Sequence, residues 1–234
     1  MSKDIAIRET INLPALSNDM AGAYAEEMEG LSFNYDRAKI PAGGGLTFEI
    51  GEGEDIDVAK EIEGVIVDHH PVNAFWLNPY SGGNQAPDCS SIDGKRGTLY
   101  GDCKTCQYNQ WGSDAATGGK LCKNQHRIYI LQEGATLPIL LTLPPTSLKA
   151  FGSYLSKRIL ERGKLPRYVL TRFGLKKATN STGIAYSEVT FTRSDDLPDS
   201  VKPQMDAYCA ELKTMTRALS IADEYAAADE DYPF

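Results

Sequence analysis

The spacing of apolar residues predicts a chain made mainly of strands, with helices at three places. Residues 62–77 hold a β-branched run that continues into Phe75-Trp76-Leu77, and we expect it to form a long, bent central strand. Shorter strands are predicted at 46–50, 127–131, 137–143, 167–177 and 183–193, with a turn at 180–183 between the last two.

Helical spacing marks the other elements. A short capped helix is predicted at 17–29. A second is predicted at 146–162, with Gly163 as its stop and an apolar face made of Leu148, Phe151, Leu155 and Ile159. The last, at 200–222, has a stripe at alternating steps of 4 and 3, namely Val201, Met205, Tyr208, Leu212, Met215 and Leu219. Such a stripe is buried either on its own domain or against a partner helix, so a homo-oligomer is one of two readings.

The order of these elements predicts the fold class. A strand, a long bent strand, an insertion, a strand, a helix and two more strands match the OB-fold, a five-stranded barrel whose helix lies between its third and fourth strands. We therefore predict an α+β protein that is mainly β. Its expected parts are an acidic helical segment at 1–40, an OB-like domain at 41–195, a C-terminal helix at 196–222 and a disordered acidic tail at 223–234.

Composition limits the class of protein. The chain has 234 residues, of which 41% are hydrophobic, enough for a real core. No stretch approaches the roughly 18 consecutive apolar residues of a membrane span, and no signal-length apolar segment follows the N-terminus. We expect a cytoplasmic protein that does not contact membranes and keeps its thiols reduced. No Ser-His-Asp set or carboxylate cluster stands at a credible spacing, so we do not expect an enzyme.

The net charge of −8 is unevenly distributed along the chain. Residues 1–64 carry 14 acids and 5 bases, and the segment from 223 onward carries 5 acids and no base. By contrast, residues 149–177 carry 9 bases and one acid, and residues 95–127 carry 6 bases and 2 acids. An acidic protein can therefore have a basic face, and the face matters more than the total for binding phosphates.

Four of the five cysteines lie in an aperiodic insertion at 80–126: Cys89, Cys103, Cys106 and Cys122. The C-x-x-C pair places two thiolates on one tight turn, which suits two corners of a zinc tetrahedron. The fourth ligand is Cys89 or His126, and we favour Cys89 because His126 opens the next strand. With four protein ligands the Zn2+ would be structural and would order the insertion. A redox C-x-x-C lacks the expected βαβ context, and disulfides are disfavoured in the cytoplasm.

Aromatic and basic residues that share strand faces predict single-stranded DNA binding. Nucleobases stack on aromatic rings, and phosphates interact with the positive charges of Arg and Lys. In strand 127–131, Ile128 and Ile130 point inward, which leaves Arg127 and Tyr129 on the opposite face. The predicted DNA contacts that share this combination are Arg127, Tyr129, Tyr168, Arg172, Lys176, Tyr186, Trp76, Trp111 and Lys123.

The sequence ends on acids followed by aromatic residues and a proline, Asp229-Glu230-Asp231-Tyr232-Pro233-Phe234. Such a peptide offers a ring and a terminal carboxylate to a pocket lined by basic residues. It resembles the Asp-Asp-Asp-Ile-Pro-Phe tip of bacterial single-stranded DNA-binding proteins. Enzymes of DNA metabolism bind to that tip. The resemblance implies that this segment recruits replication or recombination enzymes.

The insertion and its surroundings resemble proteins encoded by phages and integrative elements. The matching motifs are Pro87-Asp88-Cys89-Ser90-Ser91-Ile92-Asp93-Gly94, Gly101-Asp102-Cys103-Lys104-Thr105-Cys106, Trp111-Gly112-Ser113, Cys122-Lys123-Asn124 and Leu143-Pro144-Pro145-Thr146-Ser147. The resemblance covers about residues 60–190 and implies a four-cysteine zinc site in a bacterial host cell. The combination of OB-like barrel, zinc insertion and acidic tail also resembles the single-strand binding protein of T-even phages in its architecture.

Two functional hypotheses follow. The first is a single-stranded DNA-binding protein of replication or recombination, whose acidic tip recruits partner enzymes and competes for the DNA groove. The alternative is a zinc-stabilised protein–protein adaptor, such as a transcription or host-takeover factor, that does not bind DNA. The net acidity and the apolar stripe of the last helix favour the alternative.

Overall fold

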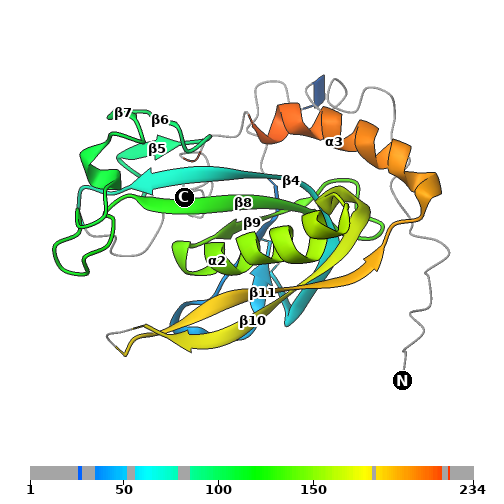
Figure 1. Ribbon diagram of the computed structural model, residues 1–234, viewed down its shortest axis with the longest axis horizontal. Coiled ribbons are helices and arrows are strands. Elements are labelled where there is room, and N and C mark those ends of the chain that lie inside the picture. Colours follow the sequence, from blue (N-terminus) through cyan, green and yellow to red (C-terminus); the bar gives the residue numbers. More distant parts are fainter. Residues whose placement is uncertain are drawn as a thin grey trace, which may run out of the picture.

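The computed structural model describes residues 26–27, 35–51, 56–78, 85–180, 183–217 and 221. Within these ranges, nine strands form one sheet and two more form a small ribbon, accompanied by two α-helices (Figure 1). The prediction of a mainly β, α+β protein is therefore confirmed. Most of the helix predicted at 17–29 and all of the segment 223–234 lie outside the described residues.

The strands of the sheet follow the order β11-β10-β4-β8-β9-β1-β2-β3, with β5 paired to β4. Their bounds are β1 Arg37–Lys39, β2 Phe48–Ile50, β3 Asp57–Ala59, β4 Glu61–Phe75, β5 Cys89–Ser91, β8 Lys123–Leu131, β9 Ile139–Leu143, β10 Val169–Thr179 and β11 Ala185–Asp196. The ribbon is β6 (Arg96–Gly97) with β7 (Gly101–Asp102). The helices are α2 (Pro145–Tyr154) and α3 (Lys202–Thr216), and short 3-10 turns include η1 (Ala42–Gly44), η2 (Gln107–Asn109), η5 (Pro166–Tyr168) and η6 (Asp199–Val201).

The long strand β4 organises the sheet, as the sequence predicts. Its first half pairs antiparallel with β10 and its whole later part pairs antiparallel with β8. The chain then continues through β9, α2 and the hairpin β10–β11. The strand predicted at 46–50 is present as β2, but it pairs with β1 and β3 and not with β4. The sheet has more than the five strands expected, because β1, β3 and β5 were not predicted. Since β1 pairs in parallel with β9, the folded unit begins before residue 41, the expected boundary.

The main core lies between the curled sheet and α2. Ile128, Ile130 and Leu141 from the sheet meet Phe151 and Ile159 from the helical segment, and all five are buried. Leu148 and Leu155 pack against the same cluster, so the predicted apolar face of the helix at 146–162 is confirmed. After α2 the helix continues as one turn of π-helix, Leu155–Ile159 (called the π-turn below), and then as a 3-10 turn, η4 (Leu160–Arg162). It ends at Gly163, whose φ of 68° is the left-handed conformation that favours glycine.

A second core lies on the outer face of the sheet, beneath α3 (Figure 1). Met205, Tyr208 and Leu212 from the predicted stripe are buried there against sheet residues such as Tyr129 and Leu140. Leu219, which continues the stripe in sequence, lies outside the described residues. The helix therefore uses its apolar face to cover its own sheet. As a result, β8 is buried on both of its faces in this region.

Candidate nucleic-acid groove and cysteine cluster

A groove of about 460 Å³ lies where β1, β8, β9, the start of α2 and β11 meet. Strand alternation explains which side chains line it. Ala38 belongs to the main core, so its neighbours Arg37 and Lys39 project to the other side of β1. In β9, Leu141 and Leu143 are in the core and Thr142 faces the groove. The lining is completed by Ile40, Pro41, Gln125, Leu140, Pro144, Thr146, Tyr186 and Ser187.

The groove has the chemistry of a surface for phosphates and bases. Arg37 and Lys39 supply positive charge, Gln125 supplies an amide and Tyr186 supplies an aromatic ring. No carboxylate is among the described residues that line it. Among the described lining residues, positive charge therefore outweighs negative charge, which favours the approach of a polyanion.

One side of the groove is fixed by a side chain that joins two distant parts of the chain. Ser187 Oγ on β11 lies 2.8 Å from the carbonyl oxygen of Pro41 and 2.9 Å from that of Gly45. Ser187 is buried, and these two carbonyls belong to the loop around η1 that follows β1. The contact holds β11 beside the β1 segment, so the basic residues of β1 and the ring of Tyr186 belong to one groove.

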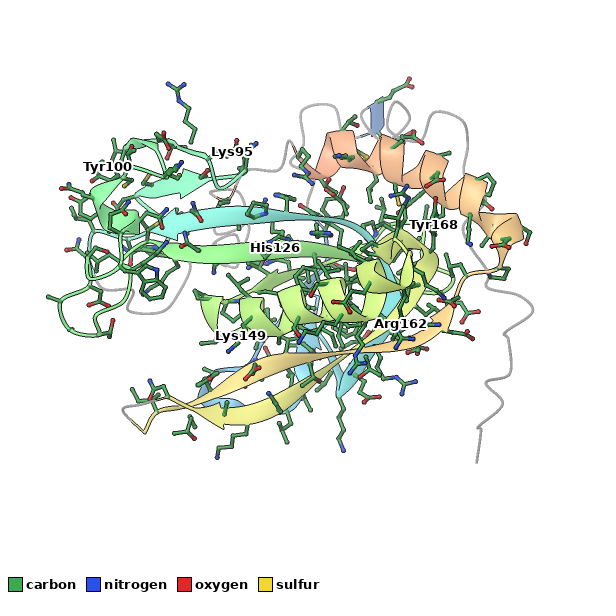
Figure 2. The ribbon with its side chains drawn as sticks, in the orientation of Figure 1. Lys95, Tyr100, His126, Lys149, Arg162 and Tyr168 are labelled. Carbon is green, nitrogen blue, oxygen red and sulfur yellow. The ribbon has the colours of Figure 1, made fainter. Side chains whose placement is uncertain are left out.

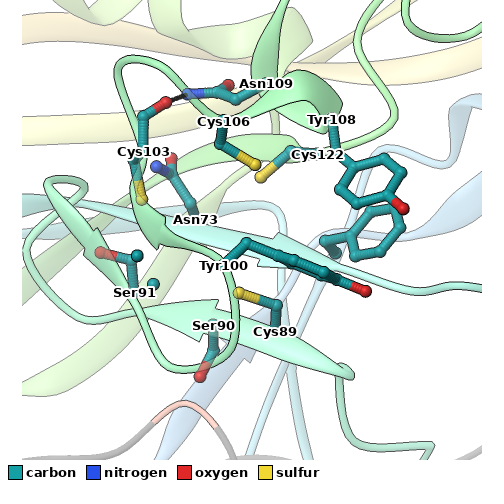
Figure 3. A pocket seen from close by; sticks show the side chains of 13 residues that line it. Asn73, Cys89, Ser90, Ser91, Tyr100, Cys103, Cys106, Tyr108, Asn109 and Cys122 are labelled. Atoms are coloured by element: carbon teal, nitrogen blue, oxygen red, sulfur yellow. Dashed lines mark hydrogen bonds between the residues drawn. The ribbon is translucent and has the colours of Figure 1, made fainter.

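The four cysteines of the insertion converge on one small cavity (Figure 3). Cys89 comes from β5, Cys103 and Cys106 from the turn after β7, and Cys122 from the residue before β8. In Figure 3 the sulfur atoms of Cys106 and Cys122 point toward each other, and those of Cys89 and Cys103 point into the same cavity. The four cysteines that the sequence predicts as zinc ligands therefore line one cavity.

The cavity has the size of a single small sphere. Its volume is about 10 Å³, comparable to the space that one water molecule occupies by this measure. Burial, followed by the neighbouring thiols of Cys103, Cys106 and Cys89, raises the pKa of Cys122 to about 12. Soft thiol donors around a one-atom cavity fit a zinc ion in type and in number. As the side chains stand, no three His, Cys, Asp or Glu groups of the described chain are already arranged to hold a metal.

Polar and aromatic contacts fix the backbone around the cysteines. Asn109 Nδ2 donates to the carbonyl of Cys103 at 2.7 Å, and the backbone N–H of Cys122 donates to the carbonyl of Tyr108 at 2.9 Å. The ring of Tyr108 stacks on Phe75 of β4 with centroids 4.3 Å apart. Gly97 is required on steric grounds, because a Cβ there would lie 2.8 Å from the sulfur of Cys89. These contacts tie the described part of the insertion to the end of β4.

The alternative fourth ligand, His126, lies elsewhere. Its Nε2 is 2.9 Å from Nδ1 of His69, and both rings contact Phe151 of α2. His126 does not line the cysteine cavity. Burial, then the neighbouring His69, lowers the pKa of His126 to about 4, and burial also lowers the pKa of His69. The geometry therefore favours Cys89 over His126 as the fourth ligand.

Two predicted DNA contacts are corrected by the structure. Arg127 and Tyr129 do lie on the face opposite Ile128, but both have a relative exposure of 0%. The hydroxyl of Tyr129 donates to the carbonyl of Thr216 at 3.1 Å, beneath the end of α3. The end of α3 covers Tyr129, and since Arg127 is also fully buried, neither side chain is on the surface where a nucleic acid could contact it.

The other predicted contacts fall into three separate places. Tyr168 donates to Asp206 of α3 at 2.6 Å, with Lys202 5.4 Å from its ring. Arg172 and Lys176 share an exposed face of β10, where carboxylates neutralise them: Arg172 pairs with Glu61 and Glu63, and Lys176 with Glu188. In and beside the insertion, Trp76 Nε1 donates to the carbonyl of Gln85, Lys123 is exposed, and Trp111 is 81% exposed with Lys120 above its ring. Of the predicted set, Tyr186 alone lines the groove.

Sequence reasoning missed the basic residues of β1. Arg37-Ala38-Lys39-Ile40 alternates polar and apolar residues, which is the signal of a half-buried strand. The run is short and lies in a segment whose net charge is strongly acidic, so its alternation did not stand out. Gln125, Thr142 and Thr146 carry no signal of their own and are identified only by their place in the groove.

The comparisons with known proteins add no relative. No protein-family model matches the chain, and neither the curated proteins nor the solved structures gave a match. No helix in the described part of the chain is long and apolar enough to cross a membrane.

Proposed function

We propose that this protein binds single-stranded DNA through an OB-like barrel, in the replication or recombination of a mobile element. The path of the chain supports the OB-like reading. Strands β4, β8, β9, β10 and β11 are joined in the order of an OB barrel, α2 lies between β9 and β10, and β10 returns to pair with β4. Segment β1 occupies the free side of β9, where an OB barrel would close directly on its fifth strand.

The observation that carries the proposal is the position and chemistry of the groove. OB-folds bind oligonucleotides on the face of their second and third strands, between the loop that follows strand one and the loop that joins strands four and five. In this chain the corresponding strands are β8 and β9, which contribute Gln125, Leu140 and Thr142 to the groove. The corresponding loops are the cysteine insertion and the β10–β11 turn. Arg37, Lys39 and Tyr186 supply the charge and the ring that single-strand binding requires.

The cysteine cluster is proposed as a structural zinc site held by Cys89, Cys103, Cys106 and Cys122. Four protein ligands leave the metal no open coordination position, so its role would be to order the insertion. A metal there would hold Trp111 and Lys123 on one ordered unit. The acidic segment 229–234 is proposed to recruit replication or recombination enzymes by its Phe and its charges.

A gel-shift titration tests the proposal directly. Single-stranded and double-stranded oligonucleotides are compared at 50 mM and 200 mM salt. We expect a shift of the single strand that weakens with salt, with log affinity falling by about 0.7 per unit of log salt for each phosphate neutralised. The variant Arg37→Gln/Lys39→Gln should bind more weakly and with a smaller salt slope, while Lys60→Gln/Lys213→Gln, the matched control, should not. Failure of the wild type to shift a single strand at low salt would sink the proposal.

The adaptor hypothesis keeps one supporting observation. The insertion exposes Trp111 at 81% and Leu99 at 61%, and a protein partner could cover such side chains. The apolar stripe of the last helix no longer favours it, because Met205, Tyr208 and Leu212 are buried on the protein's own sheet. If single strands are not shifted while Trp111→Ala abolishes capture of a protein partner, the adaptor reading replaces DNA binding.

A further inference from the structure

The exposed face of the helical segment 145–162 carries basic side chains that the groove does not use. Lys149 on α2, Lys157 and Arg158 in the π-turn, and Arg162 in η4 are all exposed. Figure 2 shows Lys149 near the start of this segment and Arg162 at its far end. Glu161 is the single acid between them in the sequence, so this segment carries a net positive charge.

These bases differ from the basic residues of β10. Arg172 and Lys176 pair with glutamates of neighbouring strands. In the described part of the chain, Lys149, Lys157, Arg158 and Arg162 form no salt bridge within 4 Å. Their charge is therefore not neutralised within the described fold and is available to an external anion.

The basic face is continuous with the groove. Thr146, in the first turn of α2, lines the groove, and Lys149 stands three residues further on, which places it on the same side of the helix. Ser153 and Lys157 continue this exposed line. Arg162 is 16 positions after Thr146, which corresponds to roughly 24 Å at about 1.5 Å per residue.

The π-turn helps to present the bases together. It holds Ile159 fully buried in the main core while Lys157 and Arg158, just before it, remain exposed. Ser156 Oγ donates to the carbonyl of Gly152 at 2.9 Å, which satisfies a backbone acceptor at the widened turn.

We infer that this surface is a second phosphate track, along which a bound single strand continues after it leaves the groove. The inference rests on the proposed function, and it extends the DNA-binding site to Lys149, Lys157, Arg158 and Arg162. Short strands would occupy the groove alone. Longer strands would occupy both the groove and the track, so the contribution of these four bases would depend on the length of the strand.

The test compares oligonucleotides of about 6 and about 16 nucleotides, which span the usual range of OB-fold site sizes. The variant Lys157→Gln/Arg158→Gln/Arg162→Gln leaves the groove intact. We expect it to bind the longer strand about tenfold more weakly at low salt, with the salt slope reduced by about 2, since each lost phosphate contact removes about 0.7. Its affinity for the shorter strand should equal that of the wild type. Lys60→Gln/Lys202→Gln/Lys213→Gln makes the same change of net charge away from α2 and should leave both affinities unchanged.

The outcomes separate the track from the groove. If the wild type binds both strands and the track variant binds the longer one equally well, the track is overturned while the proposed function stands. An equal loss for both lengths also overturns it, because it would place these bases in the groove or in general charge attraction. If the track variant instead loses affinity for a synthetic peptide of residues 229–234 and keeps its DNA affinity, the surface binds an acidic peptide. Absence of binding by the wild type to either strand overturns the proposed function together with the track.

Discussion

Tyr186 supplies the aromatic ring of the groove, and it is the side chain on which a base would stack. Stacking of a base on an aromatic side chain contributes about 1–3 kcal/mol. Tyr186→Ala should therefore weaken single-strand binding by roughly 5-fold to 150-fold, while Tyr186→Phe, which keeps the ring, should retain most of the affinity. Fluorescence titration with a labelled oligonucleotide measures both variants. Equal affinities for the Ala and Phe variants would rule out stacking at this position.

The contact between His69 and His126 makes stability depend on pH. The unfolded chain takes up a proton on each histidine near pH 6.5, whereas burial and the neighbouring His69 lower the pKa of folded His126 to about 4. Between these values the unfolded state binds more protons, so the free energy of unfolding should fall as the pH drops from about 6.5 to about 4.

The variant His126→Gln removes the contribution of His126 to this pH dependence of the free energy of unfolding. The variant's free energy of unfolding should fall less steeply than that of the wild type, by at most about 1.4 kcal/mol per pH unit. Urea denaturation at pH 7, 6 and 5 measures the difference, in a range where most carboxylates remain ionised. His70 continues to contribute in both proteins, because burial lowers its pKa to about 4 as well. Parallel profiles for the two proteins would contradict the assignment.

At the scale of the elements, α3 is a covering layer for the outer face of the sheet. Leu212 is fully buried in that contact, and Arg217, just past the helix, donates to both carboxylate oxygens of Asp68 at 2.9 Å. The bulge in β4 between Ile66 and Asp68 sets the position of that carboxylate. The helix is thus joined to β4 by an apolar contact and by a charged one.

Loss of the apolar contact should be costly. Leu212→Ala leaves a cavity and should lower the free energy of unfolding by about 2–5 kcal/mol. Lys213→Ala, on the exposed neighbour, should change it by less than about 0.5 kcal/mol. Denaturant melts of the three proteins provide the measurement. If Leu212→Ala were as mild as Lys213→Ala, the buried position of α3 would be wrong.

The cysteine insertion should depend on its metal. We expect about one zinc per chain by elemental analysis, and Cys103→Ser should lower that content. Because burial and the neighbouring thiols raise the pKa of Cys122 to about 12, this thiol is protonated at neutral pH, and metal uptake should release protons into a weakly buffered solution. Removal of the metal with a chelator should make the insertion sensitive to protease while β10 and β11 remain protected. Cys209→Ser, outside the cluster, is the matched control and should keep the zinc content of the wild type.

Patterns along the chain predicted the elements better than the surfaces that they leave exposed. The alternation in β8 correctly places Ile128 and Tyr129 on opposite faces of the strand. The spacing in the helical segment 146–162 correctly identifies Phe151 and Ile159 as buried. What covers the second face of β8 depends on a contact between residues 87 positions apart, Tyr129 and Thr216, and no local pattern encodes it. That the four cysteines would lie together was predictable, because their spacing along the chain is one that zinc ligands commonly have.

At the scale of the whole molecule, the distribution of charge decides how an acidic protein can bind an acidic polymer. The acids concentrate in residues 1–64 and from 223 onward, while the groove and the helical track present bases. If the acidic segment competes with DNA, deletion of residues 229–234 should leave DNA affinity unchanged or raise it, most visibly at low salt. The same deletion should abolish binding of partner enzymes.

The variant Phe234→Ala, which keeps every acidic residue of the segment, should lose the binding of partner enzymes without any gain in DNA affinity. Loss of DNA binding on deletion would show that the segment has another role.

The parallel pairing of β1 with β9 has a consequence for how the chain can be divided. In the fold, β9 pairs with Arg37 and Ala38, and the N–H of Leu140 donates to the backbone carbonyl of Asp36. Without residues 35–40, these backbone groups of β9 would lose their partners. Such a bare edge, next to the apolar run Ile139-Leu140-Leu141, is a template for pairing between chains. A fragment that starts at residue 41 would then tend to self-associate through β9. The three-residue strand β1 thus covers an edge of β9 that would otherwise be open to a second chain.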